Sequence, residues 1–267
     1  MNPGNRKAAS KRPRGFFLLT RMKEILIDYL NRNNQNKFDL KAVIFDMDGV
    51  LYDSMPAHDR SWQQTMDEEG LTHEPGEFYL HEGRIGKATI DIIFQRNLQR
   101  DATEEEVERI YARKTELFGL YNSGDTIPGA REVLDYVKEM NLTPVLVTGS
   151  GQPSLLSRLD HHFPDTFTPG TMVTAFDVVN GKPDPEPFLK GLQKGGELLP
   201  HQAIVIENAP LGIEAAVGAG IFTIAVNTGP LSDAILREAG ASLVFSSMNH
   251  LREALPAIIR LTGVVTA

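Results

Sequence analysis

Two aspartates stand immediately after a short apolar run, at the point where a buried strand is expected to end. Asp46 and Asp48 follow the run Ala42–Phe45 and are separated by Met47. Because side chains alternate along an extended segment, both carboxylates face the same way. Like charges this close raise each other's pKa unless a cation, or a positive charge that develops in a reaction, lies between them. A lone aspartate at a strand end usually caps a turn, so the interpretation depends on the other strand ends.

Two further segments carry groups suited to binding phosphate. Thr148, Gly149 and Ser150 follow another apolar run and offer a hydroxyl and exposed backbone amides to phosphate oxygens. Lys182 stands in the segment Gly181–Pro185, where two prolines make a rigid turn ahead of an expected helix. Taken alone, Thr148 could equally well be an ordinary capping hydroxyl. A lysine such as Lys182 is usually interpreted as a solvated loop residue.

An acid and an amide close a third apolar run. Glu207 and Asn208 follow Ala203–Ile206. Carboxylate, amide and backbone carbonyl oxygens are hard ligands, and Mg²⁺ prefers such ligands while it keeps several waters and a phosphate oxygen in its shell. If these groups meet Asp46 and the backbone carbonyl of Asp48, the set is suited to Mg²⁺.

The elements that position these residues alternate between strands and helices. Near-continuous apolar runs separated by helical stretches are typical of a parallel sheet covered on both faces. The fold class is therefore predicted as α/β, with an open, doubly wound parallel sheet. The expected strands are Ala42–Phe45, Pro144–Val147, Ala203–Ile206, Phe222–Val226 and Ser242–Phe245. The expected helices include Ala130–Met140, Pro185–Lys194, Leu211–Ala219 and Asp233–Ala239.

One interval interrupts the alternation. Between residues 58 and 125 the pattern is helical throughout, with helices expected over Ser61–Glu69, Lys87–Leu98 and Thr103–Phe118. The last begins with a Thr103-x-x-Glu106 capping box. We expect residues 58–125 to form a small helical cap over the carboxyl edge of the sheet, where open α/β folds bind their ligands. Residues 41–57 and 126–267 would then form the core domain.

The first 40 residues form a basic leader with a short helix expected over Met22–Leu30. Six basic and no acidic residues lie in positions 1–21, so the remainder is more acidic than the whole-chain net charge of −8. A body this acidic repels nucleic acid phosphates. The leader itself is interpreted as a disordered tail, or as sequence ahead of a start at Met22, rather than as an arm for nucleic acid or membrane surfaces.

Composition excludes several other classes of protein. No apolar run approaches the roughly 20 residues that cross a bilayer, and none makes a signal peptide, so a cytoplasmic location is expected. The chain contains no cysteine, so a disulfide framework, a thiolate nucleophile and a thiolate zinc site are all excluded. We expect a monomer.

Four segments in this order resemble the haloacid dehalogenase superfamily of phosphotransferases, in the subgroup with a helical cap that contains β-phosphoglucomutase and small sugar phosphatases. The four segments are DMDGVLYDS from Asp46, TGS from Thr148, GKPDP around Lys182, and ENAPLGIEAA from Glu207. The resemblance covers residues 41 to about 244. Each segment is weak by itself, but four in order at expected element boundaries are highly specific.

The resemblance implies a role for each of these residues. Asp46 would attack phosphorus and form an aspartyl-phosphate. Asp48 would protonate the leaving oxygen and later activate water. Thr148, Gly149, Ser150 and Lys182 would bind the phosphoryl oxygens. Mg²⁺ would be held by Asp46, Asp48, Glu207 and Asn208 and would screen the carboxylate from the phosphate.

Two departures from the subgroup affect the expected function. Relatives commonly carry a second acid where this chain has Asn208, so weaker metal binding, or binding through a water, is expected. The mutase grips a second phosphate with a cap arginine and a core lysine, whose positions here are Gly86 and Gly151. Arg84 or Lys87 would have to substitute. Without a fixed second phosphate site, water competes for the aspartyl-phosphate and hydrolysis is favoured.

The resemblance therefore implies an Mg²⁺-dependent phosphomonoester hydrolase that acts on a small phosphorylated sugar or polyol. The alternative is a β-phosphoglucomutase-type phosphohexomutase. His58 matches a histidine of these relatives and is expected to pair with Asp48 or to contact substrate, and Arg84 is expected to bind substrate. A phospho-accepting signalling module or a binding protein is disfavoured by the acid at Asp48 and by the cap.

Overall fold

The computed structural model describes residues 14–150 and 153–267. In this part of the chain, six parallel strands form one sheet in the order β3-β2-β1-β4-β5-β6. The strands are β1 (Ala42–Phe45), β2 (Thr143–Val147), β3 (Met172–Val173), β4 (Ala203–Glu207), β5 (Phe222–Val226) and β6 (Leu243–Phe245). The predicted α/β class is confirmed. The two-residue β3 was not predicted because so short a run carries no periodicity.

Helices cover both faces of the sheet, and the alternation of side chains along β1 shows how. Val43 and Phe45 belong to an apolar cluster with residues of α6 (Ala130–Glu139), α11 (Met248–Thr262) and α1 (Arg14–Arg32). Ala42 and Ile44 belong to a second cluster with residues of α8 (Glu186–Lys194) and α9 (Pro210–Gly218). Since neighbours on a strand point to opposite faces, each face of β1 is buried under its own helices. The remaining core helices are α7 (Pro153–His162) and α10 (Asp233–Glu238).

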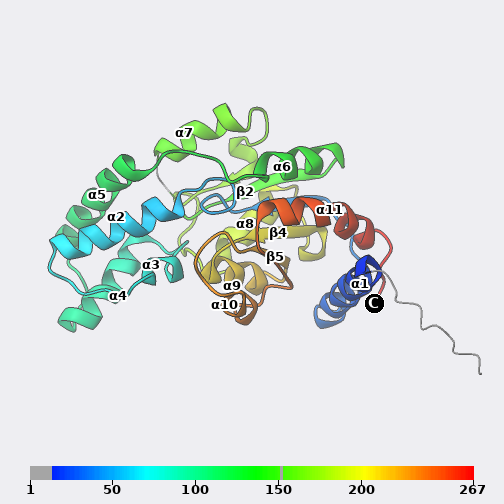
Figure 1. The fold of residues 1–267 in the computed structure, drawn as a ribbon, viewed down its shortest axis with the longest axis horizontal. Helices are drawn as coiled ribbons and strands as arrows, with labels where there is room; N and C mark the ends of the chain where they lie inside the picture. Colours follow the sequence, from blue (N-terminus) through cyan, green and yellow to red (C-terminus); the bar gives the residue numbers. More distant parts are fainter. Residues whose placement is uncertain (1–13, 151–152) are drawn as a thin grey trace, which may run out of the picture.

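The segment between β1 and α6 is helical. It contains α2 (Met55–Glu68), α3 (Glu77–Leu80), α4 (Gly86–Leu98) and α5 (Glu104–Tyr121), which gather at one end of the molecule in Figure 1. These helices bury an apolar cluster of their own that includes Trp62, Phe78 and Ile93. The predicted capping box is present, because Thr103 accepts from the backbone of Glu106 and the Glu106 side chain accepts in return. We refer to α2–α5 as the cap.

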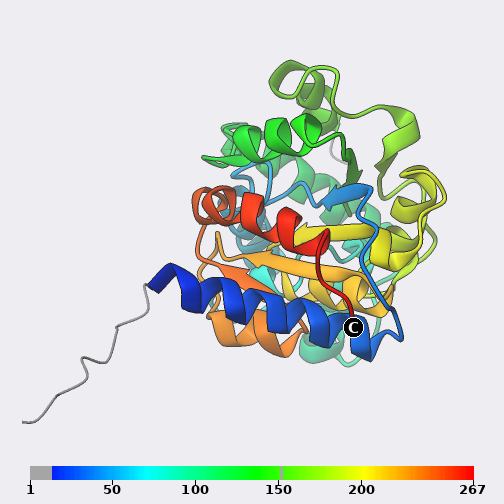
Figure 2. The same cartoon turned by 90° about the vertical axis from the view of Figure 1, so that its right-hand side faces the viewer.

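The first helix is longer than the sequence pattern suggested. A helix was predicted over Met22–Leu30, whereas α1 spans Arg14–Arg32. The prediction that the leader is disordered is therefore wrong for residues 14–21, and residues 1–13 lie outside the described part. Leu26 and Leu30 are fully buried, and the Tyr29 hydroxyl donates to the backbone carbonyl of Gly220 at 2.7 Å. Figure 2 shows α1 lying along the core, and it packs against α11.

None of the described helices is long and apolar enough to cross a membrane.

The strand order brings three of the predicted site segments to one edge. β1 lies between β2 and β4, so the residues that follow these strands, Asp46 and Thr148, and the last residue of β4, Glu207, meet at the carboxyl edge. The chain order of the strands reverses beside β1, and open α/β sheets bind ligands at such a reversal.

Candidate active site

Lys182 joins two of the predicted site acids. Its Nζ lies 2.5 Å from Asp46 Oδ1 and 2.6 Å from Glu207 Oε1, and the side chain is almost fully buried. Burial alone would lower the pKa of Lys182, but the two carboxylates outweigh burial and hold the pKa above its usual value. Lys182 is thus a charged, buried group rather than a solvated loop lysine.

Asp46 lies in a site that is short of positive charge. Burial, with smaller contributions from Glu207 and Asp48, raises the pKa of Asp46 to about 8 against the lowering effect of Lys182. A carboxylate in this position is costly to ionise without further positive charge. Lys182 therefore offsets only part of the repulsion among these acids. The rest calls for a positive charge that the described protein atoms do not supply.

Asp48 sits in a different environment although it is only two residues away. Ser54 Oγ donates to Asp48 Oδ1 at 2.5 Å, and His58 Nε2 lies 3.4 Å from the same oxygen. Burial would raise the pKa of Asp48, but His58, the Ser54 hydrogen bond and Lys114 together lower it below its usual value. The pKa of Asp46 is therefore raised while that of Asp48 is lowered. Opposite pKa shifts in neighbouring acids are typical of groups with separate roles in catalysis.

Gly49 allows the tight turn that separates these acids from the rest of the chain. Its φ is +81°, a value that favours glycine, and a Cβ atom there would lie 2.1 Å from Asn208 Nδ2. The backbone can therefore pass close to Asn208 only because residue 49 has no side chain.

His58 is held between Asp48 and a buried cap lysine. Lys114 Nζ lies 2.7 Å from His58 Nδ1, and the His58 ring packs on Phe118. Burial lowers the pKa of His58, and burial lowers the pKa of Lys114 to about 7. His58 therefore pairs with Asp48, one of the two predicted options, and a neutral ring accounts for an Nδ1 that can accept from Lys114.

Sequence reasoning missed Lys114, Ser54 and Glu82. The signal for Lys114 was its place on the buried face of α5, where Ile110, Lys114 and Leu117 follow helical spacing and the lysine is 2% exposed. A charged residue on an otherwise apolar stripe is a sign of a buried polar contact.

The segment after β2 contacts the cap directly. Thr148 is buried, and its Oγ1 accepts from the backbone amide of Ser150 at 2.9 Å. A Cβ atom at Gly149 would lie 2.8 Å from the carbonyl oxygen of Gly83, so glycine is needed for this close approach. Thr148, Gly149 and Ser150 all line the same pocket as Asp46 and Asp48.

Glu207 is fully hydrogen-bonded within the core. Its Oε2 accepts from the backbone amides of Asn208 and Ala209 at 2.7 and 2.9 Å, while Oε1 faces Lys182. Glu207 is thereby fixed as a partner of Lys182 at the start of α9.

Asn208 instead reaches the cap. Its Nδ2 donates to Glu82 Oε2 at 2.9 Å. Asn208 Oδ1 and Glu82 Oε1 are both buried without a hydrogen-bond partner in the described chain. Burial raises the pKa of Glu82 well above its usual value, and Asp46, Glu207 and Asp48 raise it further.

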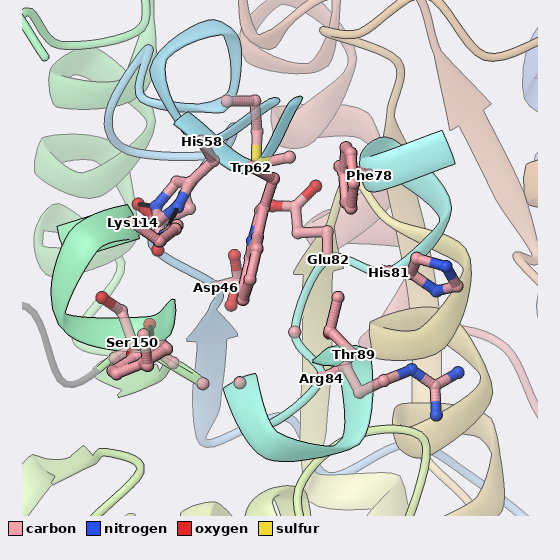
Figure 3. A pocket seen from close by; sticks show the side chains of 17 residues that line it. Asp46, His58, Trp62, Phe78, His81, Glu82, Arg84, Thr89, Lys114 and Ser150 are labelled. Carbon is pink, nitrogen blue, oxygen red and sulfur yellow. Dashed lines mark hydrogen bonds and ion pairs between the residues drawn. The ribbon is translucent and has the colours of Figure 1, made fainter. Parts of the chain in front are cut away.

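Arg84 contributes to the pocket wall, but its head group is turned away from the acids. Figure 3 shows the guanidinium pointing away from Asp46. Burial lowers the pKa of Arg84, and its Nε is buried without a partner among the residues described. That Arg84 binds substrate stays a prediction, and in this orientation its head group does not reach the acids. Gly86 cannot carry a larger side chain here, because a Cβ atom would lie 2.4 Å from the Tyr111 ring. Gly151 lies outside the described residues.

The pocket between core and cap is lined by side chains from both parts (Figure 3). Its cavity volume is about 70 Å³, which is room for about five water molecules. The core supplies Asp46 and Asp48, and the cap closes the space with Trp62, Tyr111 and Glu82. A phosphoryl group fits this cavity.

Only part of the predicted donor set has the chemistry of a metal site. No group of three or more His, Asp or Glu side chains with the arrangement of a metal cluster occurs in the described ranges. The ammonium of Lys182 occupies the space between Asp46 and Glu207 instead. Asn208 Oδ1 and Glu82 Oε1, on side chains that are hydrogen-bonded to each other, are nevertheless buried without a partner among the described residues. Such oxygens, with Asp46 and a backbone carbonyl, suit a hard dication.

Comparisons with known proteins match this combination of fold and site. The family model described as haloacid dehalogenase-like hydrolase matches residues 40–220, which contain all of the site residues above. The chain belongs to the haloacid dehalogenase-like hydrolase family.

The relatives of this hydrolase that have assigned activities include sugar phosphatases. Hexitol phosphatase A of Escherichia coli (strain K12) is 31% identical over 188 residues, which are 70% of this chain and 83% of that protein. The phosphorylated carbohydrates phosphatase of Thermotoga maritima is 31% identical over 223 residues, 81% of this chain and all of that protein.

A solved structure from Bacteroides vulgatus, provisionally assigned as a beta-phosphoglucomutase, is 50% identical. Its TM-score is 0.88, and the match covers 91% of this chain and 98% of that one. The similarities thus include both phosphatases and a mutase-like protein.

Proposed function

We propose that this hydrolase removes the phosphoryl group from a small phosphorylated sugar or polyol and transfers it to water through an aspartyl-phosphate on Asp46. The observation that supports this most directly is the pair of buried acids with opposite environments. Asp46 contacts Lys182, and Asp48 is held by Ser54 and His58. This difference in environment supports Asp46 as the nucleophile and Asp48 as the acid and base.

In the first step, a carboxylate oxygen of Asp46 forms a bond to phosphorus while the bond to the leaving oxygen breaks. Asp48 gives its proton to that oxygen, so the alcohol leaves neutral. The pKa of Asp48 is lowered in the free protein, but the negative charge of an arriving phosphoryl group raises a neighbouring carboxyl's pKa. Substrate binding therefore favours the protonated form of Asp48 that this step needs.

In the second step, Asp48 takes a proton from water as the water attacks phosphorus, and Asp46 leaves as a carboxylate. Lys182 neutralises Asp46 throughout, and Thr148 and the amides after it donate to the phosphoryl oxygens. The products are inorganic phosphate and the free alcohol. The cap limits the water that enters the small cavity.

Enzymes of this superfamily generally use Mg²⁺, and we propose the same for this chain. Asp46, the backbone carbonyl of Asp48, and Asn208 would hold the ion, with Glu207 positioning Lys182 and the start of α9. When bound, Mg²⁺ supplies the charge that lets an anionic carboxylate approach an anionic phosphoryl group. Chelation should abolish phosphate release, and added Mg²⁺ should restore it.

Hydrolysis is favoured over mutase activity by the wall of the pocket. A mutase has to hold a second phosphate, and the position at Gly86 is blocked by Tyr111 while Arg84 points away from the acids. We also propose that the protein is a monomer and that it acts in the cytoplasm, where phosphorylated metabolites are retained.

A panel of phosphorylated compounds graded by leaving-group size tests this function. The panel contains pyrophosphate, glycerol phosphate, a hexitol phosphate and β-glucose 1-phosphate, each with Mg²⁺, and the Asp46→Asn variant as control. We expect phosphate release from a polyol or sugar phosphate without a bisphosphate primer. Isomerisation of β-glucose 1-phosphate with little release would establish the mutase. Turnover confined to pyrophosphate would keep phosphoryl transfer but overturn the proposed substrate class.

A further inference from the structure

The cap contributes one acid to the pocket, and its position is unusual for a charged group. Glu82 lies in the loop between α3 and α4 and lines the same pocket as Asp46 (Figure 3). Among the described cap residues that line the pocket, it carries the only carboxylate. Asp46, Glu207 and Asp48 of the core lie close enough to raise its pKa. An acid that closes over other acids opposes closure unless positive charge lies between them.

The hydrogen bond to Asn208 satisfies only half of this carboxylate. Glu82 Oε2 accepts from Asn208 Nδ2, but Glu82 Oε1 has no partner in the described chain. Asn208 is 8% exposed, and its Oδ1 is also unpartnered. Buried polar oxygens are normally paired, and leaving one unpaired costs about 1–3 kcal/mol. Two such oxygens, on side chains that are already hydrogen-bonded to each other, indicate one shared partner that accepts electron pairs, such as a cation.

The nearest cationic group does not fill this role. Lys182 Nζ is committed to Asp46 and Glu207, and its stem packs against Gly83, next to Glu82, where a Cβ atom would lie 2.7 Å from Lys182 Cδ. The loop that carries Glu82 is thus already seated on the core. The described residues therefore supply no partner for these two oxygens, and a bound group could do so.

We propose that Glu82 is a cap-supplied ligand for the divalent cation, acting with Asn208, so that binding of the cation and closure of the cap are one event. The proposal rests on the proposed function for the presence of the cation in this site. A carboxylate from the cap replaces the negative charge that Asn208 lacks. Cation affinity then depends on a residue of the other domain, and an open cap holds the ion less tightly.

The first readout is cation binding without substrate. Magnesium chloride is titrated calorimetrically into the full-length protein and into Glu82→Gln, which keeps the shape of the side chain and removes its charge. Since metal affinity follows ligand charge, we expect the dissociation constant to rise by about tenfold. Glu74→Gln is the matched control, because Glu74 is an exposed cap residue outside the pocket, and its affinity should equal that of the wild type.

The second readout is cap closure. Trp62 is the single tryptophan of the chain and lines the pocket from the cap side. Acrylamide quenching of its fluorescence therefore reports access to the pocket. We expect Mg²⁺ to reduce quenching in the wild type and in Glu74→Gln, and to leave it unchanged in Glu82→Gln. Glu82→Ala replaces the amide variant if circular dichroism shows that the latter does not fold.

The possible outcomes separate this inference from the proposed function. Weaker binding together with loss of Mg²⁺-dependent protection in Glu82→Gln alone supports it. Wild-type affinity and protection in Glu82→Gln would overturn it, and phosphate release in the substrate panel would still establish the hydrolase. A wild-type protein that bound no Mg²⁺ would overturn both this inference and the proposed cofactor.

Discussion

The buried ammonium of Lys114 provides a quantitative test of the site's electrostatics. Its side chain is 2% exposed in the cap, and burial lowers its pKa to about 7, with partial compensation by Asp48. In the unfolded chain a lysine has a pKa of about 10.4. The unfolded state therefore binds more protons than the folded state between about pH 7 and pH 10. The free energy of unfolding should rise with pH across this window.

The magnitude follows from the two pKa values. With a folded-state value of about 7, the penalty for Lys114 is about 4 kcal/mol at pH 7 and about 2 kcal/mol at pH 9. Lys114→Met keeps an unbranched chain of similar length and removes the charge. The variant should thus be more stable than the wild type, by about 2 kcal/mol more at pH 7 than at pH 9.

Urea unfolding at the two pH values measures this difference. Trp62 fluorescence follows the cap and circular dichroism follows the whole chain, so separate unfolding of the cap would be detected. Lys23→Met is the control, because Lys23 is exposed on α1. Its effect should stay within about 0.5 kcal/mol at both values. An equal effect of Lys114→Met at pH 7 and pH 9 would refute the reasoning, since the ammonium would then carry no penalty in the folded state.

Two further predictions concern the acid and the wall of the pocket. Asp48→Asn should lower the rate of phosphate release by at least about 100-fold, because the proton donor is lost. Its thermal midpoint should change little, because the volume of the side chain is kept. A rate near that of the wild type would show that Asp48 does not have its proposed role. Gly86→Ala should destabilise the protein by about 1–3 kcal/mol in urea, because its Cβ meets the Tyr111 ring at 2.4 Å. Gly119→Ala on α5 meets nothing within 4 Å and should be neutral or stabilising; equal effects at both glycines would contradict the packing described here.

The residues at strand ends were predictable because their positions follow from local pattern. The apolar run before Asp46 predicts a strand, and the order of strands in a doubly wound sheet then brings Asp46, Thr148 and Glu207 to one edge. The expected strand Ala42–Phe45 has the same bounds in the structure. The helix boundaries differed by a few residues where no cap marked them, as at the start of α2.

The contacts between domains were not predictable in this way. Ser54 and Glu82 reach the site through turns, which have no period in the sequence. Helical spacing could place Lys114 on the buried face of α5, but its contact with His58 depends on how the cap helices pack. Arg84 illustrates the same limit, since its place in the loop suggested substrate binding while its side chain points away from the acids. Sequence spacing identifies which residues lie near a pocket, and packing decides which way they point.

The central claim is that Asp46 forms a covalent bond to the transferred phosphoryl group. The direct measurement is mass spectrometry of peptides from enzyme quenched in acid during turnover, with borohydride reduction to fix the site. The account predicts one added phosphoryl group on the peptide with Asp46, its conversion on reduction at position 46, and no adduct in Asp46→Asn. Steady phosphate release by the wild type with no adduct at any quench time, or with the adduct on another residue, would contradict it.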